Sequence, residues 1–221
     1  MLRGGRAVGS AGLAALLAAA TLAACSGEGD ALDQAASREV LLSAEDLPLD
    51  GYTQGKVAED LEQSGQAAPH AFRRNFEQFG SLGDECSAAM DRLSTSVTPK
   101  EFLQSKTTAE YTSGGHVLTI TVGGTTKDPA EVIEAFRDIG ADCDTLEGGQ
   151  PGTSAVVTFE EVEREGVDGS SILVDLNGTR TQQVLVGRAV GDNLVLVMTK
   201  DVGVEDAARV LDAQAEAIED H

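Results

Sequence analysis

The sequence predicts an α+β domain: an antiparallel β-sheet with helices packed mainly on one face, and one disulfide bond. Three observations lead to this prediction. Segments in the second half of the chain have strand character and are joined by short connections, which favour antiparallel pairing. Other segments have apolar residues at the three- and four-residue spacing of an amphipathic helix. Beyond residue 25 the chain has two cysteines, Cys86 and Cys143.

The first elements are expected to be short. Residues 38–47 predict a helix that stops before a proline. Within it, Ser43 and Asp46 have the spacing of a capping box for a second short turn. Residues 52–57 are a plausible strand, and the polar residues 62–69 indicate a loop.

Apolar spacing predicts two further helices before the middle of the chain. One packs three of the six phenylalanines, and the other places a cysteine near its start. The residues concerned are Phe72, Phe76 and Phe79 in the first helix, and Cys86, Met90 and Leu93 in the second.

A β-hairpin and a well-marked helix follow. Residues 102–112 and 116–122 read as two strands around a Ser-Gly-Gly turn. Asp128 and the proline after it begin a helix, because Asp can cap and Pro suits the first helical position. Gly140 is suited to the C-terminal cap of that helix, and Cys143 follows closely.

The C-terminal part indicates a meander and a closing helix. Turn residues separate the expected strands, and the last segment is amphipathic with acidic residues in its first turn. The expected strands are residues 155–159, 172–176, 184–190 and 194–198, and the helix covers residues 204–218.

The strand at residues 194–198 is apolar on both faces, whereas a strand covered on one side should alternate. Its second face must therefore be covered. The cover is either another layer of this domain, a partner, or a ligand in a cleft.

The N-terminus indicates export and lipid attachment. Arg3 and Arg6 precede 18 uncharged residues rich in Ala and Leu, which is typical of a signal peptide. The motif Leu22-Ala-Ala-Cys25 resembles the bacterial lipobox, in which the peptide is cut before the cysteine and the thiol receives diacylglycerol. An ordinary secretory signal and an uncleaved anchor are the alternatives. Residues 1–24 are thus predicted to be a lipoprotein signal peptide, and residues 25–36 a lipidated, flexible tether.

Charge narrows the possible partners. The chain has 16 basic and 37 acidic residues, and without Arg3 and Arg6 the mature chain would carry 14 and 37, a net charge of -23. This balance excludes nucleic acid, which requires clustered Lys and Arg. It also provides no basic patch for anionic lipids, so the lipid on Cys25 would be the attachment to the membrane.

Cys86 and Cys143 are expected to form a structural disulfide, because a pair in an exported protein is most simply a bridge. A metal site would need further ligands, and none of His70, His116 and His221 lies at ligand spacing from a cysteine. A redox pair would normally be closer in sequence.

We find no catalytic motif in the sequence, and no enzyme, metal or cofactor is predicted. There is no G-x-S-x-G, H-E-x-x-H, P-loop or G-x-G-x-x-G pattern. His116 lies on the apolar side of its strand and is interpreted as a core residue. Acidic clusters such as Glu160-Glu161 are interpreted as solvated surface, although paired carboxylates also serve in glycoside hydrolysis.

The order of features resembles a known family. It comprises the lipobox, "LLSAEDLPLDGY" at residues 41–52, a helix with Cys86, a strand pair, "DIGADCDTL" around Cys143, and "GRAVGDNLVLVMTK" near the end. Together these resemble the extracellular sensor domain of PknH-type mycobacterial Ser/Thr kinases and related actinobacterial lipoproteins. The resemblance implies an antiparallel sheet with helices and a ligand cleft. That family has two disulfides where this chain can form one, and no ligand-binding residue can be carried over.

These observations predict a single sensor-like domain at residues 37–221, outside the cytoplasmic membrane and anchored by Cys25. Its function is expected to be non-catalytic, binding a small molecule, a lipid or an envelope protein. The alternative is a lipid-carrying or structural envelope lipoprotein. A deep apolar cavity would favour lipid transport, and a shallow polar-rimmed groove would favour sensing.

Overall fold

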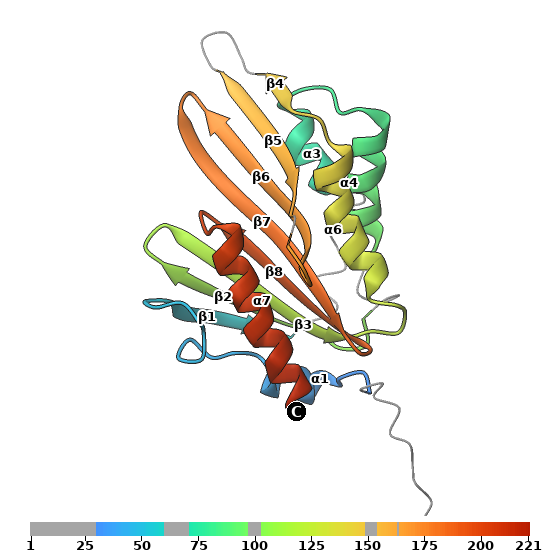
Figure 1. Ribbon diagram of the computed structural model, residues 1–221, viewed down its shortest axis with the longest axis vertical. Coiled ribbons are helices and arrows are strands. Elements are labelled where there is room, and N and C mark those ends of the chain that lie inside the picture. The colour runs from blue at the N-terminus through green and yellow to red at the C-terminus, as the bar shows by residue number, and fades with distance from the viewer. Residues whose placement is uncertain (1–29, 60–70, 97–102, 149–153, 163) are drawn as a thin grey trace, which may run out of the picture.

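The structure is a computed structural model that describes residues 30–59, 71–96, 103–148, 154–162 and 164–221. These residues build one eight-stranded antiparallel sheet in the order β1-β2-β3-β8-β7-β6-β5-β4 (Figure 1). The strands are β1 (Thr53–Ala58), β2 (Thr107–Ser113), β3 (His116–Gly124), β4 (Leu146–Gly148), β5 (Ala155–Glu161), β6 (Asp168–Leu176), β7 (Thr179–Val190) and β8 (Asn193–Lys200).

Five helices accompany the sheet in the described residues. In Figure 1, α7 lies across β7 and β8, whereas α3, α4 and α6 lie beside β4, β5 and β6. The helices are α1 (Gln34–Glu39), α3 (Ala71–Glu77), α4 (Asp84–Ser96), α6 (Ala130–Asp142) and α7 (Val204–Glu219). Within the described parts of the chain, no helix combines the length and the apolar character needed to span a bilayer.

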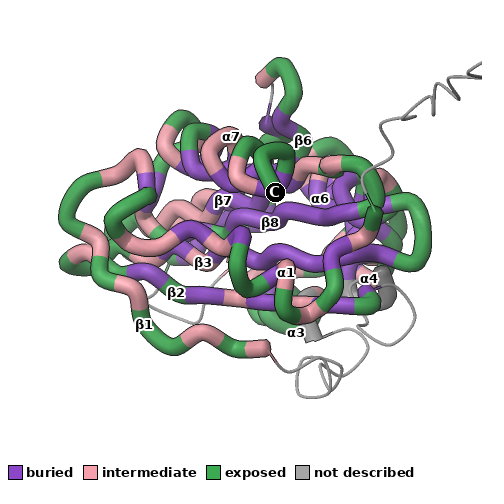
Figure 2. The backbone as a smooth tube through the Cα atoms, turned by 90° about the horizontal axis from the view of Figure 1, so that it is seen from below, coloured by how far each residue is buried: buried purple, intermediate pink, exposed green. Residues whose placement is uncertain are grey.

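Strand β8 shows how the helices cover the sheet. Val195 and Val197 belong to the apolar cluster that contains α7, while Leu194 and Leu196 belong to the cluster that contains α6. Because successive strand residues point to opposite faces, α7 and α6 lie on opposite faces of the sheet. The central strands are correspondingly the most buried part of the backbone in Figure 2.

The predicted α+β class, the antiparallel sheet and the disulfide are therefore confirmed. The helices divide between the two faces of the sheet instead of lying mainly on one. The doubly apolar strand at residues 194–198 is covered by other layers of the same domain, which was the first of the three explanations considered.

Several predicted boundaries are wrong for identifiable reasons. The helix expected at residues 38–47 is α1, which starts earlier and ends at Glu39. Helix α6 continues past Gly140 to Asp142, since this glycine allows α6 to approach β5: a Cβ there would lie 2.6 Å from the Glu160 carbonyl oxygen. Strand β4 was missed because three residues carry too little alternation to be recognised.

The first strand of the predicted hairpin begins later than expected, at Thr107, and Leu103 makes an isolated bridge with Thr125. The phenylalanine helix is confirmed as α3, with the ring of Phe76 5.4 Å from that of Phe159, but α3 ends at Glu77 and Phe79 lies beyond it. The loop predicted at residues 62–69 lies outside the described residues.

Residues 30–36 differ most from expectation. Their small polar composition predicts a flexible tether, but α1 begins at Gln34 and Leu32 is buried with 8% of its surface exposed. Small polar residues suggested a solvated linker, yet their backbone groups are bonded to the domain, as described below.

Because α6 covers only part of its face of the sheet, two residues on β8 are expected to differ in their contribution to stability. Leu196 is buried beneath α6, whereas Met198, two residues on and on the same face, is 41% exposed. Leu196→Ala is expected to lower the free energy of unfolding by about 2–5 kcal/mol, because it leaves a cavity. Met198→Ala, the matched control, is expected to cost about 1 kcal/mol. Urea denaturation measures both, and equal losses would contradict the described cover.

Candidate functional site

The two predicted disulfide cysteines come together as expected. The Cys86 and Cys143 sulfurs are bonded at 2.11 Å, with their Cα atoms 4.5 Å apart. The bond joins the start of α4 to the end of α6, and an ion pair between Arg92 and Asp138 of 2.8 Å joins the same helices. Cys25, the predicted lipid attachment site, lies outside the described residues.

The two described histidines, His116 and His221, line different cavities and do not come together. His116 is exposed, and its Nδ1 contacts the carbonyl oxygen of Asp201, so its interpretation as a core residue is wrong. His116 is the first residue of β3, where the sheet face is no longer covered. His70 lies outside the described residues. Among those that are described, no three His, Cys, Asp or Glu side chains are placed to hold a metal ion.

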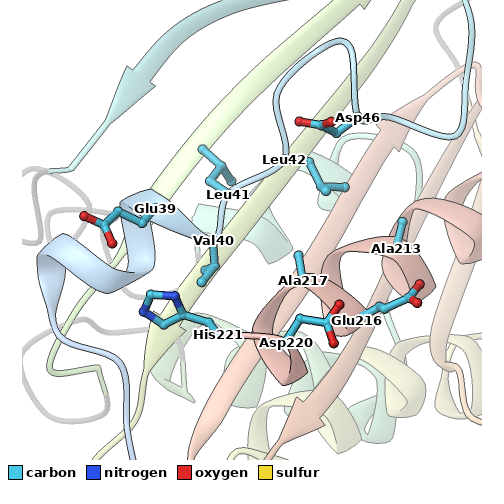
Figure 3. Close-up of a pocket in the computed structure, with 10 residues that line it drawn as sticks. All are labelled: Glu39, Val40, Leu41, Leu42, Asp46, Ala213, Glu216, Ala217, Asp220 and His221. Carbon is cyan, nitrogen blue, oxygen red and sulfur yellow. The ribbon is translucent and has the colours of Figure 1, made fainter.

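A surface groove of about 470 Å³ lies between the chain that follows α1 and the last turns of α7 (Figure 3). We call it the α7 groove. Its floor is aliphatic and its rim carries carboxylates, as the labelled sticks in Figure 3 show. It is lined by Glu39, Val40, Leu41, Leu42, Asp46, Ala213, Glu216, Ala217, Asp220 and His221.

One wall of the groove is attached to α7 by a buried amide. Gln214 is fully buried, and its Oε1 accepts a hydrogen bond of 3.0 Å from the backbone N–H of Leu42. Its Nε2 donates one of 2.7 Å to the carbonyl oxygen of Val40. Both ends of the amide are satisfied, so residues 40–42 are held against α7 just after α1 ends.

A second side chain fixes the same wall from the sheet. The Tyr111 hydroxyl on β2 donates to the carbonyl oxygen of Leu42 and accepts a bond of 3.3 Å from Gln54. Burial raises the pKa of Tyr111, while the bond from Gln54 acts in the opposite direction. The hydroxyl therefore remains a neutral donor at physiological pH.

A turn forms where the sequence predicts one, although its bonds differ from those of the predicted capping box. Ser43 Oγ donates to Asp46 at 2.6 Å, and the Asp46 backbone N–H reaches the Ser43 carbonyl oxygen at 3.2 Å. This places the Asp46 carboxylate on the groove rim opposite the carboxylates of α7. Four carboxylates around an aliphatic floor can accept a ligand with a cationic group and a small apolar part.

Two other open cavities are lined by described residues. One of about 400 Å³ lies between α6 and the end of β7, with Arg137 and Arg188 at its rim. The other, of about 310 Å³, contains Tyr52 and His116 beside the start of α7. Burial, with a smaller contribution from the Asp206 carboxylate, raises the pKa of Tyr52.

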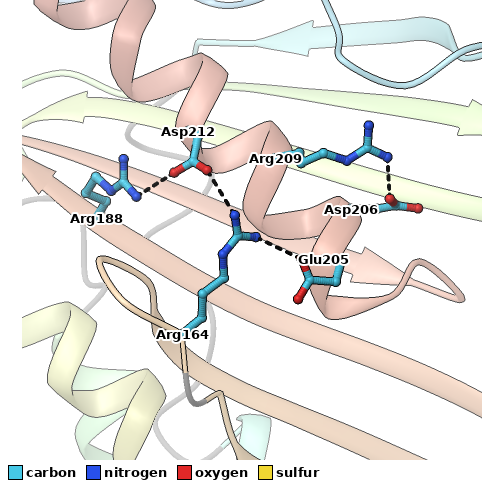
Figure 4. A network of polar contacts seen from close by, with 6 residues as sticks. All are labelled: Arg164, Arg188, Glu205, Asp206, Arg209 and Asp212. Atoms are coloured by element: carbon cyan, nitrogen blue, oxygen red, sulfur yellow. Dashed lines mark hydrogen bonds and ion pairs between the residues drawn. The ribbon is translucent and has the colours of Figure 1, made fainter.

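The arginines near the second cavity have structural partners. Asp212 on α7 accepts from Arg188 at 2.6 Å and from Arg164 at 3.4 Å, and Arg164 also reaches Glu205 (Figure 4). Arg188 donates in addition to the carbonyl oxygen of Gly166. The network fastens the turn between β5 and β6 to α7. The groove, in contrast, has no arginine or lysine among its lining residues, so it is the better candidate for a ligand.

Sequence reasoning did not find the α7 groove. One pointer was available: Gln214 interrupts the apolar side of a helix that otherwise buries Ala207, Leu211, Ala215 and Ile218. A buried amide on an apolar face requires polar partners. The sequence does not say that those partners are more than 170 positions away.

Comparison with known proteins bears on the fold. The structure resembles the crystal structure of the extracellular domain of PknH from Mycobacterium tuberculosis, with a TM-score of 0.52 and 8% sequence identity. The match covers 87% of this chain and 99% of that chain. At this identity the likeness establishes the fold alone. It confirms the fold implied by the sequence resemblance.

A second solved structure, an uncharacterised protein from Mycobacterium smegmatis, matches over 77% of this chain and 89% of that chain. Its TM-score is 0.36 at 11% identity, and we base nothing on it. No protein-family model matches the chain. No curated protein sequence matches it significantly.

The buried amide predicts a large effect from one substitution on α7. Gln214→Leu keeps the volume but leaves the Leu42 N–H and the Val40 carbonyl without partners, at about 1–3 kcal/mol for each group. Gln78→Leu, at an exposed glutamine after α3, is the control, with an expected effect within about 0.5 kcal/mol. Urea denaturation measures both. A Gln214→Leu variant as stable as the natural protein would show that the groove wall is not held in this way.

Proposed function

We propose that this protein is an exported, lipid-anchored module of the cell envelope that binds a ligand or partner without catalysis. The lipobox-like motif at Cys25 supports the anchor, and the likeness of the fold to an extracellular domain supports placement outside the cytoplasmic membrane. The α7 groove is the proposed binding site. A sensing output would pass through another envelope protein.

The shape of the α7 groove distinguishes a ligand-binding module from a lipid carrier. It is open to solvent, and four of its ten lining residues are carboxylates. A lipid carrier has to enclose an acyl chain in apolar surroundings, and a carboxylate-rimmed groove is poorly suited to that. The groove therefore favours a binding or sensor module over the alternative of a lipid-carrying lipoprotein.

The composition of the groove also favours a non-catalytic role. None of its ten lining residues is Ser, Thr, Cys or Lys, so hydroxyl, thiol and amine nucleophiles are absent from its lining.

The proposed ligand class is a small cation with a short apolar part. The rim carries Glu39, Asp46, Glu216 and Asp220 around an aliphatic floor. The floor would bury the apolar part, and the carboxylates would pair with the cationic group.

Native mass spectrometry of the protein purified from membranes tests anchor and site together. The expected mass is that of the chain from Cys25 with diacylglycerol attached. Added butylammonium is expected to bind at one equivalent. The double variant Glu39→Gln/Glu216→Gln should bind about two- to thirtyfold more weakly, because each exposed charge contributes about 0.2–1 kcal/mol.

Glu219→Gln is the matched control, because Glu219 is exposed on the same helix but does not line the groove. It should retain natural affinity. An unmodified Cys25 would contradict the anchor. Equal weakening by both sets of substitutions would contradict the groove as the site, and a tightly held phospholipid would favour the carrier.

A further inference from the structure

Residues 30–37 are bonded to the end of the sheet where β3 finishes and β8 begins. The Leu32 N–H donates to Asn193 Oδ1 at 2.7 Å, and the Ser105 hydroxyl donates to the Leu32 carbonyl oxygen at 2.5 Å. Asn193 and Ser105 are both buried, with 2% and 0% of their surfaces exposed. The backbone of Leu32 is therefore held on both sides by buried side chains.

Strand β3 lies so close to Leu32 that there is no room for a side chain between them. Gly124, the last residue of β3, has the Leu32 carbonyl oxygen where a Cβ would stand, at 2.2 Å. Its own N–H donates to Ser105 Oγ at 2.8 Å. Backbone thus packs directly on backbone, which requires glycine at this position.

Further bonds continue along the segment. Gln34 Oε1 accepts from the Lys106 N–H at 3.1 Å, and Gln34 Nε2 donates to the Lys106 carbonyl oxygen at 2.9 Å. The hydroxyls of Ser37 and Ser105 are 2.7 Å apart, and Ser37 is fully buried. Residues 30–37 consequently belong to the folded unit.

This attachment limits the distance between the domain and its proposed lipid. Asp30 is five residues after Cys25. Five residues of fully extended chain span at most about 18 Å. A tether that included residues 30–36 would reach more than twice as far and would let the domain tumble freely.

We propose that the bonded N-terminal segment orients the domain on the membrane, with the sheet end that carries Gly124 and Asn193 facing the bilayer. The inference rests on the proposed lipid at Cys25, and its partner is the lipid surface itself. The opposite end carries the β2–β3 hairpin (Figure 1). With β3 rising about 3.4 Å per residue over nine residues, the hairpin lies about 30 Å farther from the attachment point.

Charge makes the bonded attachment necessary for this orientation. Asp30, Asp33 and Asp192 lie at the proposed membrane-facing end, and anionic headgroups repel them. A long free tether would let the domain move away. Because the spacer is short and its end is bonded to Asn193, the domain stays close to the surface.

The test uses the mature lipidated protein, from Cys25 onward, in phosphatidylcholine–phosphatidylglycerol vesicles that contain nitroxide-headgroup lipid. A fluorophore is attached at Asp192→Cys or at Gly115→Cys, both of which are exposed sites at opposite sheet ends. Quenching is expected to be several-fold stronger at position 192 than at position 115. Equal quenching at the two positions would overturn the proposed orientation.

Two further variants complete the test. Twenty Gly/Ser residues inserted between Gly29 and Asp30 leave every described contact intact and add a mean reach of about 25 Å. The difference in quenching should then fall sharply, and a persistent difference would contradict an orientation set by the tether. Cys25→Ser should abolish vesicle binding. If the Cys25→Ser variant binds vesicles as well as the natural chain, the proposed lipid anchor is wrong. That outcome differs from equal quenching, which contradicts the orientation.

Discussion

Buried backbone groups near the N-terminus need hydrogen-bond partners, and much of the structure follows from how they obtain them. Between Leu32 and Leu42 the chain runs over the end of the sheet and α7, where the backbone groups of Leu32 and Leu42 are removed from water. Their partners are side chains distant in sequence: Asn193 and Ser105 for Leu32, and Gln214 and Tyr111 for Leu42. The first pair sets where the domain meets its proposed anchor, and the second pair forms one wall of the α7 groove.

The sheet provides a rigid frame for these contacts because it is covered on both faces at its centre. Strand β8 directs valines to α7 and leucines to α6, so the two helices stabilise the same strand from opposite sides. The Cys86–Cys143 bond fixes α4 against α6, and the Asp212 network fixes the β5–β6 turn against α7. The α7 groove and residues 30–37 therefore lie on elements that these separate contacts hold in place.

The sequence predicted what local patterns determine. Strand alternation, the turn residues and the apolar stripe of α7 depend on neighbours within a few positions, and so does the Ser43–Asp46 turn. The disulfide was predicted because only two cysteines remained once Cys25 was assigned to lipid.

The extent of the tether was mispredicted and the α7 groove was missed, because both depend on residues that are distant in sequence. Nothing near Leu32 indicates that Asn193 will bond it, and Gly140 resembles a helix cap until β5 is seen to pack on it. Cys25 remains a prediction.

Amide hydrogen exchange of the mature protein tests the central claim most directly. If buried side chains hold residues 32–42 within the fold, the Leu32 and Leu42 amides should exchange only through large-scale opening, at rates near those of the β8 amides. Exchange of these two amides at rates typical of an unstructured chain, with β8 still protected, would contradict the account. Residues 30–37 would then be a free tether, and the α7 groove would lack a fixed wall.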